Sequence, residues 1–248
     1  MPSKTVLVGV IVAVVVLIAL LLAAVSPPEH HEPGANDAQE LNEASNMEFG
    51  NRLKLPEPRY ASNTSVEAAL AQRRSVRAYS GEALTLEELS QLLWAAQGIT
   101  DSWGGRTAPS AGALYPLELY IVVGTVRGLD TGVYRYRPAT HELEKTKDRD
   151  VRAELADAAL NQDFIGDAAI DLVICGVFNR TAEKYGERGI RYVYMEAGHA
   201  AQNVYLQAES LNLGTVAIGA FDDVAVQQLV GVQEQGRPLY IMPVGRKE

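Results

Sequence analysis

The sequence predicts one domain of mixed helices and strands that follows an apolar N-terminal segment. At 248 residues with 47% hydrophobic content, the chain is long enough to bury one full-sized core. Residues 117–123 and 170–177 are rich in β-branched and aliphatic side chains, which is typical of strands. Residues 86–97 and 188–211 repeat apolar side chains at helical spacing.

The composition excludes several classes of protein. A formal charge of -9 and a pI near 5.0 argue against a nucleic-acid surface, because basic side chains must neutralise the phosphates. Cys175 is the only cysteine and lies in an apolar run, so we expect a small buried hydrophobe and no disulfide. His30 and His31 stand in a polar segment, and no metal site is predicted.

Residues 6–25 contain no charged or strongly polar side chain and are long enough for a helix to cross a bilayer. We therefore expect a single-pass membrane anchor within residues 1–26. A cleaved signal peptide is the alternative, since Ala23 and Ala24 could precede a cleavage site. Lys4 precedes the segment and acidic residues follow it, which weakly favours a main domain outside the cytoplasm.

Residues 27–58 are rich in proline, acidic and polar residues, which is typical of a flexible linker. The soluble domain is expected over residues 59–248. Its first helix should follow the hydroxyls of residues 62–65. Thr85 and Glu88 form a capping-box pattern before the next helix, which should end at Gly98.

Further elements follow from local patterns. The predicted strands and helix are a strand over 117–123 with one buried face, a hairpin over 132–136 and 141–145, a helix over 151–160, a central strand over 170–177, and strands over 215–218 and 239–244. Gly214 should end the long helix that begins near residue 188. That helix carries small residues through which another helix, including one of a second subunit, could approach: Ala197, Gly198, Ala200 and Ala201. His199 lies among them, and we expect it to be packed rather than catalytic.

Two stretches have the composition of a ligand site. Arg73, Arg74, Ser75 and Arg77 gather three guanidinium groups and a hydroxyl in an acidic chain, which suits a phosphate. A solvated charged face is the alternative. Pro109, Ser110, Ala111 and Gly112 leave the backbone before a strand almost uncovered, so that a planar ligand could approach it. A plain connection is the alternative there.

Four motifs in this order, RRSVRAY, PSAGALYPLE, MEAGHAAQNVYLQAESLNLGTVAIGAF and PVGR, resemble the FMN-dependent nitroreductase superfamily from about residue 60 to the end. The segments APSAGALYPLELY and AEKYGERGIRYVYMEAGH are similar to the branch whose dehydrogenases oxidise thiazolines and oxazolines in modified peptides. The resemblance implies an α+β fold with a mainly antiparallel sheet flanked by helices. It also implies an obligate homodimer with FMN at the subunit interface.

The resemblance assigns roles to particular residues. The FMN phosphate and ribityl chain would be held by Arg73, Arg74, Ser75 and Arg77, with Arg246 closing on the phosphate. The flavin of the neighbouring subunit would lie against Pro109, Ser110, Ala111 and Gly112, so added bulk at Ala111 or Gly112 should spoil a contact between chains. The N5 edge of the flavin would face the backbone of Gly219 and Ala220, and Gln162 would reach the ring or the ribityl hydroxyls.

Lys184 and Tyr185 match the pair that assists proton removal in the azoline-oxidising branch. The expected membrane anchor, and the expected lack of a large docking domain before Thr64, differ from the peptide-modifying enzymes. We expect a membrane-anchored, FMN-dependent dehydrogenase that transfers hydride through flavin N5 on a small-molecule or peptide azoline. The alternatives are an NAD(P)H-dependent reductase of nitro compounds or quinones, and a flavin-binding module without turnover.

Overall fold

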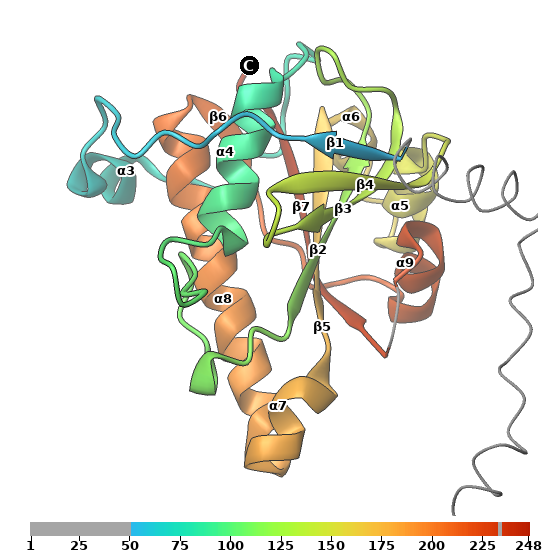
Figure 1. The fold of residues 1–248 in the computed structure, drawn as a ribbon. Helices are drawn as coiled ribbons and strands as arrows, with labels where there is room; N and C mark the ends of the chain where they lie inside the picture. Colours follow the sequence, from blue (N-terminus) through green and yellow to red (C-terminus); the bar gives the residue numbers. More distant parts are fainter. Residues whose placement is uncertain (1–50, 233–234) are drawn as a thin grey trace, which may run out of the picture. The chain divides into compact units, whose positions relative to one another are not determined.

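The computed structural model describes residues 51–232 and 235–248, and these residues form a seven-stranded sheet with helices on both faces (Figure 1). The strand order is β1-β4-β3-β2-β5-β7-β6, and all neighbouring pairs within the described residues are antiparallel. The α+β fold with an antiparallel sheet, which the resemblance implied, is confirmed.

The strands are β1 (Arg52–Lys54), β2 (Leu117–Val123), β3 (Gly132–Arg137), β4 (Glu142–Lys147), β5 (Ile170–Gly176), β6 (Leu213–Thr215) and β7 (Arg237–Arg246). The helices are α3 (Val66–Gln72), α4 (Leu86–Gln97), α5 (Arg152–Ala158), α6 (Phe164–Asp167), α7 (Phe178–Tyr185), α8 (Glu187–Ser210) and α9 (Asp223–Val230). A short 3-10 turn, η1, covers Ala111–Ala113.

The centre of the sheet is buried on both sides. All residues of β5 are buried between β2 and β7, which confirms the predicted central strand. The prediction of one buried face for β2 is wrong: every residue except Glu118 is buried, because helices cover both faces. Cys175 is fully buried in this layer, as predicted.

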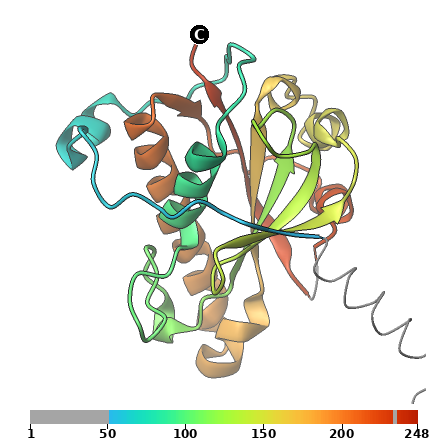
Figure 2. The same cartoon turned by 45° about the horizontal axis from the view of Figure 1, so that its top comes forward.

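Helices cover the two faces of the sheet (Figure 2), and each face carries a separate core. On one face, α4 and α8 pack against side chains such as Leu119 and Ile174. On the other, α5, α6 and α9 pack against side chains such as Tyr120 and Val173. The helix α8 is thus fixed along one face of the sheet from Val193 to Ala208, and it positions the candidate site.

The small residues of α8 serve this internal packing. Ala197, Ala200 and Ala201 are buried in the core shared with α4, so the expectation that they face another subunit is corrected. Gly198 alone among the four has open space beside it. His199 is exposed, which corrects the expectation of a packed histidine.

The local signals at α4 are confirmed. Thr85 caps α4 through a complete capping box with Glu88, and Gly98 is the C-cap residue. The end of α8 differs from the prediction, since the helix stops at Ser210 and the chain turns at Asn212 with φ of 56°. Gly214 lies in β6 instead, where a Cβ atom would be 2.6 Å from a methyl carbon of Val76.

The packed domain begins before the predicted linker boundary at residue 58. β1 pairs with β4, and Leu55 is only 2% exposed. The predicted anchor at residues 6–25 and most of the linker lie outside the described residues. Within residues 51–232 and 235–248, no helix is long and apolar enough to cross a membrane.

Candidate active site

The arginine-rich segment leaves α3 and runs along the β6–β7 edge of the sheet. The backbone N–H of Val76 donates to the Thr215 carbonyl at 2.9 Å. Tyr79 forms an antiparallel bridge with Lys247, and Ser80 N–H donates to the Arg246 carbonyl. These contacts place the cluster beside β6 and the C-terminal end of β7, as the resemblance requires.

Tyr205 of α8 organises the first part of this cluster. The guanidinium carbon of Arg73 lies 5.1 Å from the centre of the Tyr205 ring. The hydroxyl groups of Ser75 and Tyr205 are 3.2 Å apart, and the Tyr205 hydroxyl accepts the Ala217 N–H at 2.8 Å. Sequence reasoning missed Tyr205, because nothing in a helical repeat distinguishes a tyrosine that contacts an arginine from one that packs in the core.

Three further predicted residues lie beside the cluster. Arg77 stacks over Phe164 at 5.9 Å, and Gln162 is two residues before this phenylalanine. The Gln162 side-chain amide donates to the carbonyl of Ala159 at 2.7 Å and to that of Ala220 at 3.4 Å. We call the set Arg73, Ser75, Arg77, Gln162 and Ala220 the arginine half-site.

The charges of the arginine half-site fit an anionic cofactor. Within residues 51–232 and 235–248, no carboxylate pairs with Arg73, Arg74 or Arg77, and Arg74 donates only to backbone carbonyls. Unneutralised guanidinium groups suit a phosphate dianion such as that of FMN. Arg246 is different, because its guanidinium contacts Glu88 at 3.0 Å and Glu82 at 3.6 Å. Its phosphate contact stays a prediction.

The loop from residue 106 to 116 meets the Lys-Tyr pair within one chain. Gly112 has φ of 66°, and a Cβ atom there would lie 2.7 Å from Tyr185 Oη and 2.9 Å from Lys184 Nζ. The expectation that bulk at Gly112 would disturb a contact only between chains is therefore corrected. We call Pro109–Gly112 with Lys184 and Tyr185 the loop half-site.

Aromatic contacts hold the Lys-Tyr pair at the junction of α7 and α8. Lys184 Nζ lies 5.5 Å from the centre of the Tyr185 ring. The rings of Tyr185 and Tyr192 are nearly perpendicular, with their centres 5.2 Å apart. Lys184 is exposed in the single chain. An amine and a phenol side by side next to an uncovered backbone can bind a substrate and receive a proton from it.

A buried acid that sequence reasoning missed lies below this loop. Glu196 of α8 is 2% exposed, and burial raises its pKa to about 7. Hydrogen bonding from Ser110 and the positive charge of Arg106 lower this pKa, but by less than burial raises it. Arg106 is itself enclosed, with its guanidinium 4.5 Å from the Tyr115 ring and bonded to Gln97 at 2.8 Å. The sequence does contain a signal for Glu196, because an acidic residue stands there on the face of the α8 helical repeat that is otherwise apolar and buried.

The Lys-Tyr pair and Tyr205 lie at opposite ends of α8, whereas the 106–110 part of the loop runs beside the helix and reaches Asn203. Lys184 and Tyr185 lie just before the start of the helix, and Tyr205 lies near its end. From Glu187 to Tyr205 the helix rises about 27 Å, at 1.5 Å per residue. One chain therefore does not bring all the predicted residues around one ligand.

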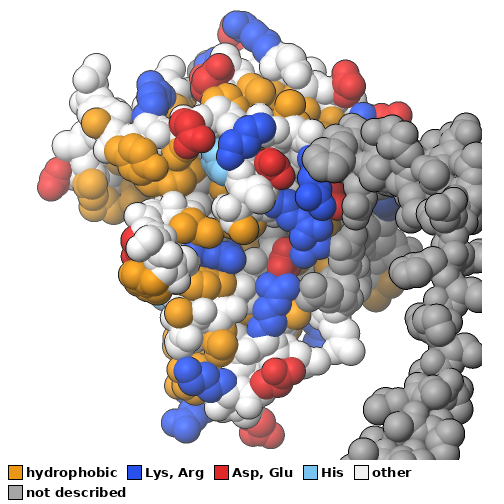
Figure 3. All heavy atoms as spheres, viewed as in Figure 1, with side chains coloured by type: hydrophobic (Ala, Val, Ile, Leu, Met, Phe, Trp, Pro, Cys, Tyr) orange, Lys and Arg blue, Asp and Glu red, His pale blue; other side chains and the backbone are white. Residues whose placement is uncertain are grey.

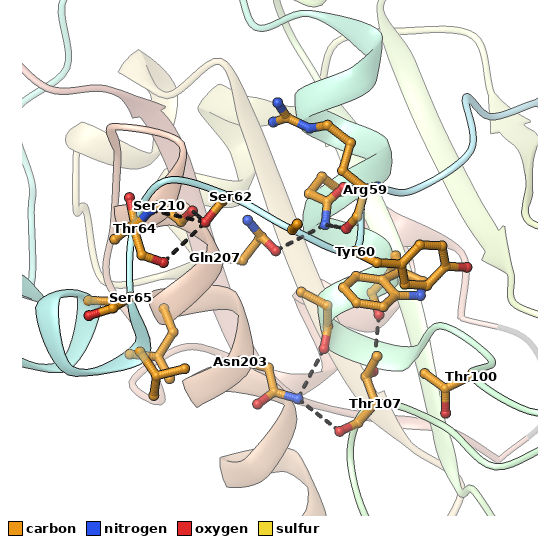
Figure 4. A pocket seen from close by; sticks show the side chains of 17 residues that line it. Arg59, Tyr60, Ser62, Thr64, Ser65, Thr100, Thr107, Asn203, Gln207 and Ser210 are labelled. Atoms are coloured by element: carbon orange, nitrogen blue, oxygen red, sulfur yellow. Dashed lines mark hydrogen bonds between the residues drawn. The ribbon is translucent and has the colours of Figure 1, made fainter.

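A cavity of about 360 Å³ opens elsewhere, between residues 59–66 and the helices α4 and α8 (Figure 4). Trp94, Gln91, Asn203 and Gln207 line it, and none of the predicted site residues does. Polar groups of its lining form hydrogen bonds within the chain. For example, the Asn203 amide donates to the carbonyls of Ala95 and Thr107. The predicted residues lie on exposed or half-exposed surfaces outside this cavity.

Known proteins resemble this chain over most of its described length. A model of the Nitroreductase family matches residues 70–246. MJ1384 of Methanocaldococcus jannaschii, which is named for this family, is 52% identical over 182 residues that cover 73% of this chain and 91% of that protein. The chain belongs to the nitroreductase family. Membership in this family indicates an oxidoreductase.

Two solved structures extend the comparison. A nitroreductase-family protein of Ralstonia eutropha superposes with a TM-score of 0.71 and 32% identity, over 80% of this chain and 90% of that chain. The Escherichia coli microcin synthetase McbBCD complex, solved with a truncated pro-microcin bound, superposes with a TM-score of 0.61 and 25% identity, over 83% of this chain and 82% of that chain. The family resemblance found in the sequence is confirmed, including its likeness to a peptide-modifying enzyme.

Proposed function

We propose that this protein is an FMN-dependent oxidoreductase whose active site is assembled from two copies of the chain. The observation that carries the proposal is the separation of the Lys-Tyr pair from the arginine half-site along α8. A two-fold symmetric pair with antiparallel α8 helices would bring the arginine half-site of each copy to the loop half-site of the other. Two complete sites would result from one interface.

The exposed surface supports such a pair. Val66 and Leu70 on α3 are 65% and 54% exposed, and Tyr194 and Met195 on α8 are 54% and 52% exposed. Figure 3 shows hydrophobic side chains gathered on the face that carries α3. In the proposed dimer a second copy would cover these apolar side chains.

In the proposed site the arginine half-site binds the FMN phosphate and ribityl chain, and the loop half-site of the other copy covers the flavin ring. Bound FMN supplies hydride transfer at N5. Lys184 and Tyr185 then lie on the substrate side, where they orient the substrate and take the proton that leaves with its oxidation. Peptide or small-molecule azolines are the substrates that we favour, because the microcin synthetase complex is similar in structure.

A complementation experiment tests the shared site. One variant carries Arg73→Ala and Arg77→Ala, and the other carries Lys184→Ala and Tyr185→Phe. Each should be inactive alone. After random subunit exchange, half of the dimers are mixed and each has one intact site, so the mixture should recover about a quarter of wild-type turnover.

Differently tagged copies must co-purify, which proves that subunits exchange. Recovery of no activity in exchanged dimers would show that each site is built within one chain. The purified protein should also be yellow, and a colourless protein that FMN cannot reconstitute would refute the cofactor.

The electron donor distinguishes a nitro or quinone reductase from an azoline dehydrogenase. Rapid bleaching of the bound flavin by NADPH, with no oxidation of a thiazoline-bearing peptide, would favour a nitro or quinone reductase.

We also propose that residues 6–25 anchor the protein in a membrane, as their unbroken apolar sequence predicts.

A further inference from the structure

We propose that Arg180 of α7 positions Lys184 against the loop, because its guanidinium joins α7 both to the Glu118 carboxylate and to the end of the loop. The inference rests on the proposed function, in which Lys184 and Tyr185 lie on the substrate side. Arg180 acts through Lys184, so it is a positioning residue.

Glu118 of β2 is bound by one guanidinium group on each of its carboxylate oxygens. Arg135 of β3 donates to Oε2 from Nε at 3.1 Å and from Nη2 at 2.8 Å. Arg180 Nη2 lies 2.6 Å from the other oxygen, Oε1. The Glu118 side chain is only 11% exposed, so solvent screens these pairs less than it screens a surface pair. The other residues of β2 are all buried, and α7 is thus attached to a strand held firmly in the sheet.

The same guanidinium contacts the end of the loop. Arg180 Nη1 donates to the Tyr115 carbonyl at 3.3 Å, and the N–H of Val177, just before α7, donates to the Pro116 carbonyl at 2.8 Å. Tyr115 has φ of 46°, which residues with a Cβ atom rarely adopt unless surrounding contacts impose it. The first turn of α7 and the last two residues of the loop are therefore fixed to each other.

Lys184 lies one helical turn after Arg180. Residues four positions apart in an α-helix lie on the same face. The Nζ of Lys184 would be 2.9 Å from a Cβ atom placed on Gly112. The face of α7 that Arg180 fixes to the end of the loop is thus the face that brings Lys184 to Gly112.

The helix α7 depends on such contacts for its orientation. It has eight residues, and no side chain caps its N-terminus, so it would not be stable alone. Its C-cap is Gly186, with φ of 60°. Close packing on α8 supports it, since a Cβ atom on Gly189 would lie 2.8 Å from backbone atoms of Ala182. That packing sets the distance between the two helices, and the Arg180 contacts set how α7 faces the loop.

The test is a double-mutant cycle of Arg180→Met and Lys184→Ala in the FMN-loaded full chain. Methionine keeps an unbranched side chain that favours a helix, and Glu118 stays paired with Arg135, so the variant should fold. Rapid mixing with saturating thiazoline-bearing peptide gives the limiting rate of flavin bleaching. We expect Arg180→Met to lower it about 10- to 100-fold when Lys184 is present, and by less than about twofold in Lys184→Ala.

Arg137→Met is the matched control. The Arg137 side chain is 33% exposed and that of Arg180 is 31% exposed, and Arg137 Nη2 lies 2.5 Å from a Glu144 oxygen. This pair joins β3 to β4, so its loss should leave the bleaching rate unchanged.

A second readout needs no flavin. Amide hydrogen exchange of residues 178–185 in the flavin-free protein should be about tenfold faster in Arg180→Met, because α7 opens more often when it is released from β2 and the loop. Arg137→Met should exchange like the wild type in this segment.

The outcomes separate this inference from the proposed function. An equal loss of rate with and without Lys184, no loss at all in Arg180→Met, or unchanged exchange in α7 overturns the role of Arg180. If the peptide does not bleach the wild-type flavin, the proposed function fails, and the exchange comparison still decides whether Arg180 fixes α7. If Arg180→Met does not fold, Arg180→Lys replaces it, since one nitrogen cannot reproduce the two-point contact of a planar guanidinium. Its rate should fall about threefold or more only when Lys184 is present, and a wild-type rate overturns the inference.

Discussion

Gly112→Ala tests the contact between the loop and the Lys-Tyr pair. The new Cβ atom would lie 2.7 Å from Tyr185 Oη and 2.9 Å from Lys184 Nζ, whereas ordinary contacts begin near 3.4 Å. Both side-chain ends must therefore move by about 0.5 to 0.7 Å or the loop must retreat, and a misplacement near 1 Å can reduce a rate about 100-fold. The positive φ of 66° adds a cost of about 1 to 2 kcal/mol to folding.

Gly128→Ala is the matched control. Gly128 has φ of 77°, and a Cβ atom there would meet nothing within 4 Å. Both variants should lose similar stability from backbone strain, because Lys184 Nζ and Tyr185 Oη are the far ends of side chains that can shift at little cost. Only Gly112→Ala should slow the reduction of bound flavin by substrate, by about 10- to 100-fold.

The assay has two parts, thermal unfolding of each variant and rapid-mixing measurement of flavin bleaching by a thiazoline-bearing peptide or, if that is inert, by NADPH. Equal bleaching rates in the two variants would refute the assignment of Lys184 and Tyr185 to the reacting side of the site. A much larger stability loss in Gly112→Ala than in Gly128→Ala would instead show that the pair is fixed by packing.

The remaining predictions concern the sheet and the N-terminus. Asp171 is fully buried with both carboxyl oxygens unpaired, and burial raises its pKa well above the usual value, so the folded state holds its proton longer than the unfolded state. The free energy of unfolding of the wild type should therefore fall as pH rises above about 4, and Asp171→Asn should fall less over the same pH range. Urea unfolding measures this difference. An identical pH dependence of the free energy of unfolding in the two proteins would contradict the prediction. Removal of residues 1–26 should move the protein from the membrane fraction to the supernatant with flavin binding unchanged, and a full-length protein found only in the supernatant would refute the anchor.

Much of the fold was predictable because local signals and burial agree. The capping box at Thr85 and Glu88 identifies α4, and the apolar run at 170–177 identifies the central strand. Errors arise where tertiary contacts override the local pattern. Gly214 is a glycine because Val76 approaches it and not because it ends α8, and β2 is buried on both faces although its pattern alternates.

The site was predictable in composition but not in arrangement. Free cations at Arg73 and Arg77 stand out in an acidic chain, and an uncovered loop at Pro109–Gly112 is visible in the sequence. Tyr205 and Glu196 were missed because both lie on the long helix, where their neighbours across space are set by packing. The sequence could not place Lys184 with Gly112 for the same reason, since the two are brought together only by the folded sheet.

The length of α8 separates cofactor binding from substrate contact in the proposed site. The arginine half-site would fix the cofactor phosphate, while the loop half-site, with Lys184 and Tyr185, would supply the groups nearest the substrate. In the proposed dimer these parts come from different copies of the chain. Changes at the α7–α8 junction could then alter the substrate without weakening the phosphate contacts, because about 27 Å of helix separates this junction from Tyr205 within one chain. On this view the substrate of this protein depends on the surroundings of Lys184, and FMN binding depends on those of Tyr205.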